Sequence, residues 1–403
     1  MIKYSCKRNT IISFTIFIEE GEKLPGMSNG RWEPQSVTAA PELNNRTTGN
    51  YEEGNAVKRW TMFLTLTLCM LGILALTGCG GQQDGKGGGK PARTVSVLFA
   101  HSSDSWQRNG VALKETLEKN GFAVDLRFAQ TAEDQTGQFR RAVEQKPLAI
   151  IVGAIDGDPL KPLLEEAAKQ KIPVIAYDRL IMGSPHVAYF VGFDSKEIGR
   201  MQGRAVERAL RLKETPGSDN IEIFAGDSRD HNSHLFYEGA MEILQPYLDV
   251  GRLRVPSDEA AFMKAATPDW SAQNAKARMG RMLQLSYAND RPLGAVLSPN
   301  DTLAEGIREA LELYYQGKWP FITGLDADPE GVRAIAADRQ LMTIDKPPAL
   351  PVKECLRLIR SIEKGQTESS AITQNNGARD VPAFLCKPAV IEKSNLESVH
   401  WAQ

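Results

Sequence analysis

Charged and amide side chains stand directly after many of the apolar segments of this 403-residue chain. Carboxylate, amide, guanidinium and ammonium groups make charge-assisted hydrogen bonds worth about 1.5–3 kcal/mol each, so they suit the binding of a small polar ligand. Asp and Asn also form turns and cap helices, and Asp301 could serve only as a helix N-cap. Their recurrence in both halves of the chain favours a binding site. The positions are residues 101–106, Asp156, Asp178, Arg179, Asp194, residues 227–232, Asn300, Asp301, Asp326, Asp345 and Lys346.

The usual signatures of catalytic, metal and nucleotide sites are missing from the part of the sequence after residue 56. The one G-x-S-x-G match, at residues 26–30, lies in the polar N-terminal stretch, and the sequence contains no H-E-x-x-H motif. Residues 80–86 match a phosphate-binding loop only until Gly87 replaces the required Ser or Thr. His231 and His234 are three positions apart, but no Cys or further His lies near them, which favours a capping or surface role over metal binding. We therefore expect no enzyme activity, no cofactor and no metal.

Strand-like and helix-like segments alternate from Thr94 onward. Short runs rich in β-branched residues predict strands, and apolar residues every three or four positions predict helices. This alternation is typical of α/β proteins with parallel sheets covered on both faces, in which ligands bind beyond the carboxyl ends of the strands. We expect two lobes with a break near residues 194–220. Strands are predicted at 94–100, 123–128, 148–154, 173–178, 187–193, 221–226, 293–298, 321–326 and 341–345, and helices at 107–120, 134–145, 160–168, 233–246, 271–287, 303–314 and 350–364.

Composition excludes several broad classes. Hydrophobic residues make up 42% and charged residues 24% of the chain, which is ordinary for a globular protein and far from disorder or collagen. The formal net charge of −2 gives no basic surface for nucleic acid. Five cysteines are too few and too scattered for a disulfide scaffold, and the sequence leaves open whether Cys355 and Cys386 pair.

The N-terminal region has the pattern of a targeting signal. Lys58 and Arg59 precede residues 62–76, which carry no charge and are too short for a membrane span of about 20 residues. The following Leu-Thr-Gly-Cys resembles the lipobox of bacterial lipoproteins, which implies lipidation of Cys79 and attachment to the cell envelope. A transmembrane anchor is the less favoured alternative.

The predicted signal covers residues 57–78, and one segment lies on each side of it. After it, the Gly-rich residues 79–92 predict a flexible tether. Residues 1–56 are polar with little periodicity, and a secretory signal normally begins the chain, so we expect a non-native extension and a true start near Val57 or Met62.

Segments spread over residues 94–391 resemble the type I periplasmic sugar-binding proteins of ABC importers, especially the multiple-monosaccharide and xylose-binding ones. That resemblance implies two Rossmann-like lobes joined by a three-strand hinge. Lobe one is then expected at 93–195 plus 346–372, and lobe two at 196–345 plus 373–403. The matching segments are IPVIAYDRLI (172–181), NIEIFAGDSRDHNSHLFYEGAM (220–241), DWSAQNAKARM (269–279), AVLSPNDTLAEGI (295–307), ITGLDADPEGVRAI (322–335) and TIDK (343–346).

The same resemblance implies which residues hold the sugar. From their opposite charges we also expect Asp178 and Arg179 to neutralise each other within the closed cleft, and Asp326 and Lys346 to do the same. The sequence departs from the family at Ser105, Asn300, Leu325 and Asp345, where relatives carry Arg, Tyr, Gln and an aromatic residue, which leaves the identity of the sugar open. The implied ligand-binding residues are Trp106, Asp178, Arg179, Asn232, Trp270, Asp301, Asp326 and Lys346.

The resemblance implies a solute-binding lipoprotein that hands a monosaccharide such as xylose, glucose or galactose to an ABC transporter permease. An alternative is a sugar-sensing adaptor that hands its closed form to a chemoreceptor or sensor kinase. A transcriptional repressor of the same fold would need a helix-turn-helix where this chain has an export signal. A glycosidase would need two carboxylates flanking a glycosidic bond, one with a raised pKa.

Overall fold

A computed structural model describes residues 93–100, 104–288 and 291–401 of the chain. The predicted extension, signal segment, Cys79 and tether lie outside these residues. All described residues belong to one unit, Gly87–Gln403. None of the helices in this part of the chain is both long enough and apolar enough to cross a membrane.

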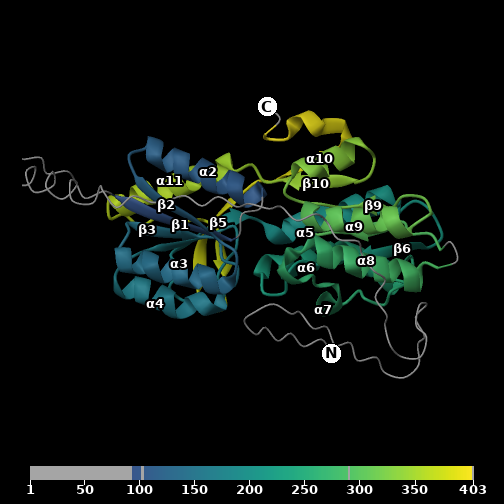
Figure 1. Ribbon diagram of the computed structural model, residues 1–403, viewed down its shortest axis with the longest axis horizontal. Coiled ribbons are helices and arrows are strands. Elements are labelled where there is room, and N and C mark those ends of the chain that lie inside the picture. The colour runs from purple at the N-terminus through teal and green to yellow at the C-terminus, as the bar shows by residue number, and fades with distance from the viewer. Residues whose placement is uncertain (1–92, 101–103, 289–290, 402–403) are drawn as a thin grey trace, which may run out of the picture. The chain divides into compact units, whose positions relative to one another are not determined.

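Lobe one is built on a sheet with the strand order β11-β12-β5-β4-β3-β1-β2. All neighbouring strands are parallel except β11 and β12, which pair in antiparallel fashion. The helices lie on both faces, with α2 and α11 on one and α3 and α4 on the other (Figure 1). The elements are β1 Thr94–Ala100, α2 Asp104–Lys119, β2 Ala123–Ala129, α3 Ala132–Gln145, β3 Ala149–Val152, α4 Lys161–Lys169, β4 Val174–Tyr177, β5 Tyr189–Phe193, α11 Ala349–Glu363, β11 Thr373–Asn375 and β12 Asp380–Cys386.

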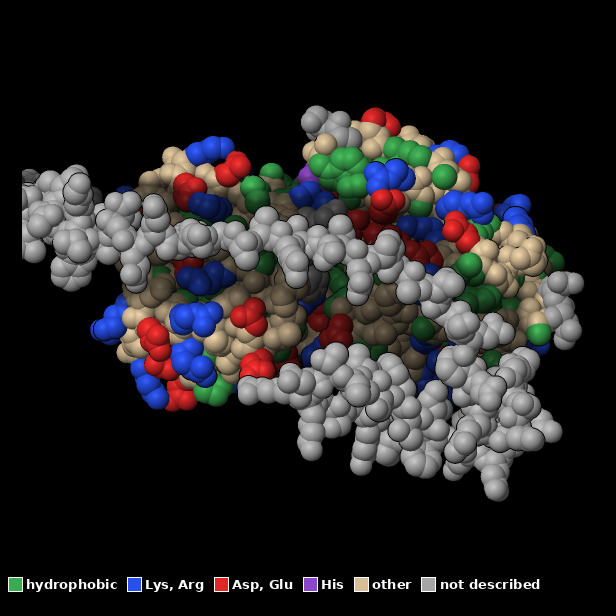
Figure 2. Space-filling view, viewed as in Figure 1, with side chains coloured by type: hydrophobic (Ala, Val, Ile, Leu, Met, Phe, Trp, Pro, Cys, Tyr) green, Lys and Arg blue, Asp and Glu red, His purple; other side chains and the backbone are tan. Residues whose placement is uncertain are grey.

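Apolar side chains on alternate positions of the central strands supply the two cores of lobe one. Ile150 and Val152 of β3 pack with α3 and α4, whereas Ala149 and Ile151 pack with α2 and α11. Both faces of β3 are therefore buried, which explains why its sequence is a continuous apolar run. On the face seen in Figure 2, acidic and basic side chains are interspersed over lobe one.

Lobe two has a smaller parallel sheet with the order β7-β6-β8-β9, and a separate antiparallel pair, β10 with β13. Helices α5 and α6 pack tightly together, as do α8 and α9. The elements are α5 Ser195–Ala209, β6 Asp219–Ile223, α6 His231–Asp249, β7 Leu253–Arg254, α7 Phe262–Ala265, α8 Ala272–Ser286, β8 Ala295–Leu297, α9 Asp301–Tyr314, β9 Phe321–Ile322, α10 Pro329–Ala336, β10 Met342–Asp345 and β13 Ala389–Glu392. Three short 3-10 helices complete the described part of the chain: η1 Asp158–Leu160 in lobe one, and η2 Pro268–Trp270 and η3 Lys393–Ser398 in lobe two.

Within the described residues the chain crosses between the lobes three times: from β5 to α5, from β10 to α11 and from β12 to β13. The predicted boundary in the tail was wrong. Residues 373–386 were expected in lobe two, but β11 and β12 extend the sheet of lobe one, where β12 pairs with β5. Only the segment from β13 onward lies in lobe two. Both sheets can accept a short apolar strand, so local sequence does not fix which sheet it joins.

Cys355 and Cys386 are both free thiols in this structure, which answers the open question of their pairing. Burial raises the pKa of Cys386 to about 11 and raises the pKa of Cys355 further. Both side chains therefore pack as small apolar groups.

Candidate functional site

A cavity of about 110 Å³ lies between the two lobes, at the carboxyl ends of the strands. This volume holds on the order of ten water-sized groups, which suits one small ligand. Its walls come from the loops that follow the strands and from the first turns of the helices behind them. The lining residues are Ser105, Trp106, Asn109, Tyr177, Asp178, Arg179, Gly192, Phe193, Asp230, Asn232, Phe236, Trp270, Asn300, Thr302, Leu325, Asp326, Asp328, Lys346 and Pro351.

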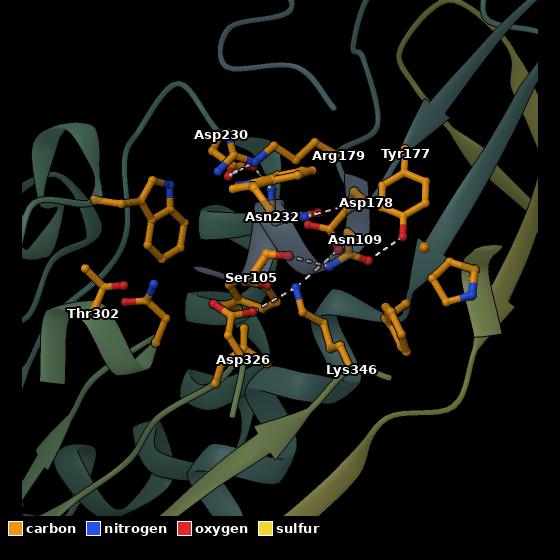
Figure 3. Close-up of a pocket in the computed structure, with 18 of the residues that line it drawn as sticks. Ser105, Asn109, Tyr177, Asp178, Arg179, Asp230, Asn232, Thr302, Asp326 and Lys346 are labelled. Carbon is orange, nitrogen blue, oxygen red and sulfur yellow. Dashed lines mark hydrogen bonds and ion pairs between the residues drawn. The ribbon is translucent and has the colours of Figure 1, made fainter. Parts of the chain in front are cut away.

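Lys346 lies between two carboxylates that come from different lobes (Figure 3). Its Nζ is 3.2 Å from Asp178 Oδ1 in lobe one and 3.2 Å from Asp326 Oδ1 in lobe two. Burial lowers the pKa of Lys346, but the two neighbouring negative charges outweigh burial and leave the pKa raised. Lys346 therefore stays protonated and can donate to a ligand while its carboxylate partners accept.

Arg179 makes the second ion pair between the lobes, with Asp230 rather than with Asp178 (Figure 3). Its Nε is 2.8 Å from Asp230 Oδ2, and its NH1 donates to the Ala154 carbonyl at 3.0 Å. Burial raises the pKa of Asp230, and the positive charge of Arg179 opposes this only in part. The expected pairing of Asp178 with Arg179 is thus wrong, because consecutive side chains leave the backbone in different directions. The expected pairing of Asp326 with Lys346 is present.

Two tryptophans, one from each lobe, line the cavity, and each packs on a glycine. A Cβ atom added to Gly153 would lie 2.6 Å from the Trp106 ring, and one added to Gly226 would lie 2.1 Å from the Trp270 ring. Trp106 also lies beneath the Arg179 guanidinium, at 5.4 Å from the ring centroid. The two glycines follow β3 and β6, so each sheet presents its aromatic ring at the end of a central strand.

Asn232 connects the lobes through its side chain. Its Nδ2 donates to the Asp178 carbonyl at 2.8 Å, its Oδ1 accepts from Ser195 Oγ at 3.0 Å, and its backbone N–H donates to Asp230. It lies in the first turn of α6 and lines the cavity as expected. Asn232 therefore binds the neighbouring loops as well as facing the ligand space.

Asp301 was expected in the binding site, but the structure places it beneath the site. Its side chain is 2% exposed and accepts hydrogen bonds from Asp328 N, Thr343 Oγ1 and Gln340 Nε2. The N-cap of α9 is Asn300, so Asp301 starts the helix and turns toward the interior of lobe two. Burial and the nearby Asp328 charge raise the pKa of Asp301 to about 8. Asn300 and Thr302 face the cavity instead.

Several cavity residues have backbone angles that side chains other than glycine rarely adopt. The φ angles are 60° at Asp178, 52° at Trp270 and 93° at Asp326, and Ala327 follows with 49°. Each such residue costs on the order of 1–3 kcal/mol and persists only where surrounding contacts fix it. Strain of this kind gathers at binding sites, which supports the assignment of this cavity as the functional site.

Seven of the eight expected ligand residues, all except Asp301, lie together around the cavity. Sequence reasoning missed Asn109, Tyr177, Asp230, Thr302 and Asp328. Asn109 could have been found from its position three residues after Trp106 on one helix face. Asp230 lay within the polar segment 227–232, but its charge gave no sign that Arg179 of the other lobe would be its partner. Among the described residues, no cluster of His, Cys, Asp and Glu has the make-up of a metal site.

Comparison with known proteins supports this geometry. Residues 95–367 match the family model of the periplasmic binding protein domain. The multiple sugar-binding periplasmic protein SbpA of Azospirillum brasilense is 35% identical over 309 residues, covering 75% of this chain and 86% of the relative. The D-xylose-binding periplasmic protein of Escherichia coli is 28% identical over 73% of this chain and 84% of the relative.

A solved structure is similar as well. The ABC transporter solute-binding protein of Clostridium phytofermentans with bound β-D-glucose has a TM-score of 0.74 and 35% identity, over 75% of this chain and 95% of that protein. The fold and site thus define a two-lobed extracytoplasmic solute-binding protein, and this chain belongs to the periplasmic binding protein domain family. The expected α/β fold and the expected family are confirmed. The family is one of solute-binding proteins rather than enzymes.

Proposed function

We propose that this protein captures one monosaccharide, such as glucose, xylose or galactose, between its two lobes and delivers it to an ABC transporter permease. The observation that carries the proposal is the cavity between the lobes. Alternating charges from Asp178, Lys346, Asp326, Arg179 and Asp230 surround it, and one tryptophan from each lobe faces it. The proposal also rests on the sugar-binding names of the relatives.

The chemistry of this cavity suits a neutral polyol. Each sugar hydroxyl both donates and accepts, so carboxylates accept from it while Lys346 and Arg179 donate to it. The C–H faces of a sugar ring are weakly apolar and can pack on an indole ring. A sugar that lacks a matching hydroxyl would leave a buried charge without its partner, which is the basis of selectivity.

Binding energy would close the lobes. A ligand that contacts both lobes only in the closed form shifts the equilibrium toward that form, and a membrane permease can then recognise the closed surface. Residues from both lobes line the cavity, and its ion pairs join one lobe to the other. The protein would therefore act as a carrier, releasing the sugar unchanged.

Titration calorimetry on the purified protein tests the proposal. We expect saturable binding of at least one sugar from a panel of D-glucose, D-xylose, D-galactose, L-arabinose and D-ribose, with one site per chain. The same sugar should be recovered unmodified after incubation. A protein that binds none of these, or that turns one over, would contradict the proposal.

The proposed location is the cell envelope, with a lipid on Cys79 after removal of residues 57–78. This part of the proposal rests on the sequence alone. A Cys79→Ser variant should leave the membrane fraction and appear as soluble protein, because it lacks the thiol that receives the lipid. If the variant stays in the membrane fraction, another segment anchors the chain.

The closed form could also be read by a chemoreceptor or a sensor kinase. The fructose-binding periplasmic domain of a hybrid two-component system has a TM-score of 0.63 with this chain, but at 21% identity the likeness concerns the fold alone. We therefore favour import. Deletion of the gene should reduce uptake of the bound sugar, whereas a purely sensory role would leave uptake intact and abolish a transcriptional or chemotactic response.

A further inference from the structure

The C-terminal segment passes behind the binding site. After β13 the chain forms η3, which packs on α10, and His400 then lies beside the end of β10, although α10 and β10 are distant in sequence (Figure 1). Val399 is fully buried against Ala327 and Ile391. Residues 399–401 thus contact Ala327 and Asp345, the chain neighbours of Asp326 and Lys346.

The first contact fixes the strand end that precedes Lys346. The His400 backbone N–H donates to Asp345 Oδ2 at 2.9 Å, and the His400 ring Nδ1 lies 2.5 Å from Asp345 Oδ1. The Asp345 side chain is only 1% exposed, and both of its carboxylate oxygens contact His400. Asp345 ends β10, and the next residue is the lysine that bridges the lobes.

The second contact supports the strained turn that presents Asp326. Trp401 Nε1 donates to the Ala327 carbonyl at 2.8 Å. Other contacts to this turn come from β10, where Ile344 O accepts from Asp326 N and Thr343 Oγ1 accepts from Ala327 N. Two consecutive residues with positive φ need such support from several sides, and the tail supplies one of them.

We propose that residues 399–401 are a positioning element of the binding site, acting through Asp345 and Ala327 on the ligand residues Lys346 and Asp326. Neither His400 nor Trp401 lines the cavity. The inference rests on the proposed function in so far as those two residues hold a sugar. It adds that the affinity depends on a C-terminal segment that does not touch the ligand.

Hydrogen–deuterium exchange on the sugar-free protein tests the positioning directly. Trp401→Phe keeps an aromatic ring but removes the N–H donor, so the peptide that contains Asp326 and Ala327 should exchange faster. Glu397→Gln, at an exposed position of η3, is the matched control and should leave that peptide unchanged. A peptide from α8 should be unchanged in both variants. Unaltered exchange around Ala327 in Trp401→Phe would overturn the inference.

Sugar binding provides the second readout. Using the sugar that the wild type binds, Trp401→Phe and His400→Ala should each lower affinity several-fold, mainly through faster dissociation. Ala327→Gly should reduce the effect of Trp401→Phe, because glycine adopts positive φ at little cost and depends less on outside support. A lower melting temperature with unchanged affinity would mean a merely structural tail and would overturn the inference. A wild type that binds no sugar would contradict the proposed function, while the exchange result would still decide the role of the tail.

Discussion

Lys346 balances the charges of the cavity, because it separates the Asp178 and Asp326 carboxylates of opposite lobes. Its position at a crossing between the lobes lets one side chain contact both. An ammonium group flanked by two acceptors is held in one place, which orients its remaining donor capacity toward a ligand. The affinity for a sugar should therefore be more sensitive to Lys346 than to any single carboxylate.

Replacement of Lys346 by Met should lower sugar affinity by about 2–5 kcal/mol, since it leaves two buried carboxylates facing each other without a cation. Asp326→Asn should cost less, because the amide oxygen can still accept. Calorimetry with the sugar that the wild type binds measures both. Asp258→Asn, at a fully exposed side chain, is the control. Equal affinities of wild type and Lys346→Met would exclude Lys346 from the site.

Asp301 contributes a pH dependence to the stability of the protein. Its pKa in the folded protein is about 8, whereas an unfolded Asp titrates near 3.9. Between these values the folded state binds a proton that the unfolded state has lost. The contribution of this group to stability is therefore full below the lower value and is lost as pH rises through the higher one.

The Asp301→Asn variant should remove this dependence. We expect the melting temperature of the variant, relative to wild type, to increase steadily from about pH 5 to about pH 8.5. The variant can be less stable at low pH, because an amide cannot accept from both Asp328 N and Gln340 Nε2. Melting curves across this range measure the difference. A constant difference between the two proteins would show that Asp301 is ionised throughout.

At the scale of elements, the strand ends place the aromatic rings. Gly226 and Gly153 leave the space that Trp270 and Trp106 occupy, so each ring packs directly on the backbone. The arrangement requires the strand, the glycine and the tryptophan together. Neither tryptophan could lie as close to the backbone if Gly153 or Gly226 were replaced by a residue with a Cβ.

Gly226→Ala should displace the Trp270 ring, because the added Cβ would lie 2.1 Å from it. Overpacking of this kind typically costs about 1–3 kcal/mol of stability, and we expect a loss of sugar affinity beside it. Gly137→Ala on α3 is the matched control, since its Cβ would lie no nearer than 3.6 Å to another atom. Thermal unfolding and calorimetry on both variants give the comparison. Full affinity in Gly226→Ala would mean that the ring position does not matter for the ligand.

At the scale of the whole molecule, contacts between the lobes define the closed form. Arg179 pairs with Asp230, Arg108 pairs with Asp328 at 2.9 Å, and Asn232 donates to the Asp178 carbonyl. Arg108 itself does not line the cavity, although its partner Asp328 does, so replacement of Arg108 weakens closure without removing a side chain from the cavity wall. Apparent affinity falls with the fraction of molecules that can close, which makes Arg108 a probe of that equilibrium.

Small-angle X-ray scattering should show a smaller radius of gyration with sugar than without it. In Arg108→Gln the closed form is less favoured, so more sugar should be needed to reach the same final radius, with a several-fold weaker apparent affinity. Arg127→Gln, whose ion pair with Asp125 lies within lobe one, should behave like wild type. A radius that does not respond to saturating sugar would contradict closure.

Much of this protein could be predicted from its residues in order. The apolar runs predicted the strands of both main sheets except β7, β11 and β12, and the polar residues after them predicted where the site would lie, because parallel strands bring their carboxyl ends to one edge. The strands and the polar residues that follow them are visible in the local pattern of apolar and polar residues, which can be found in a single sequence. The lipidation of Cys79 also remains a prediction from the sequence alone.

The tertiary structure decided which groups meet. It paired Arg179 with Asp230 of the other lobe, turned Asp301 into the interior, added β12 to the first sheet and brought His400 against Asp345. Each of these depends on contacts between segments far apart in the chain. A charged residue carries no local mark of its partner, because the pairing is fixed only when the lobes, the crossings and the tail have packed.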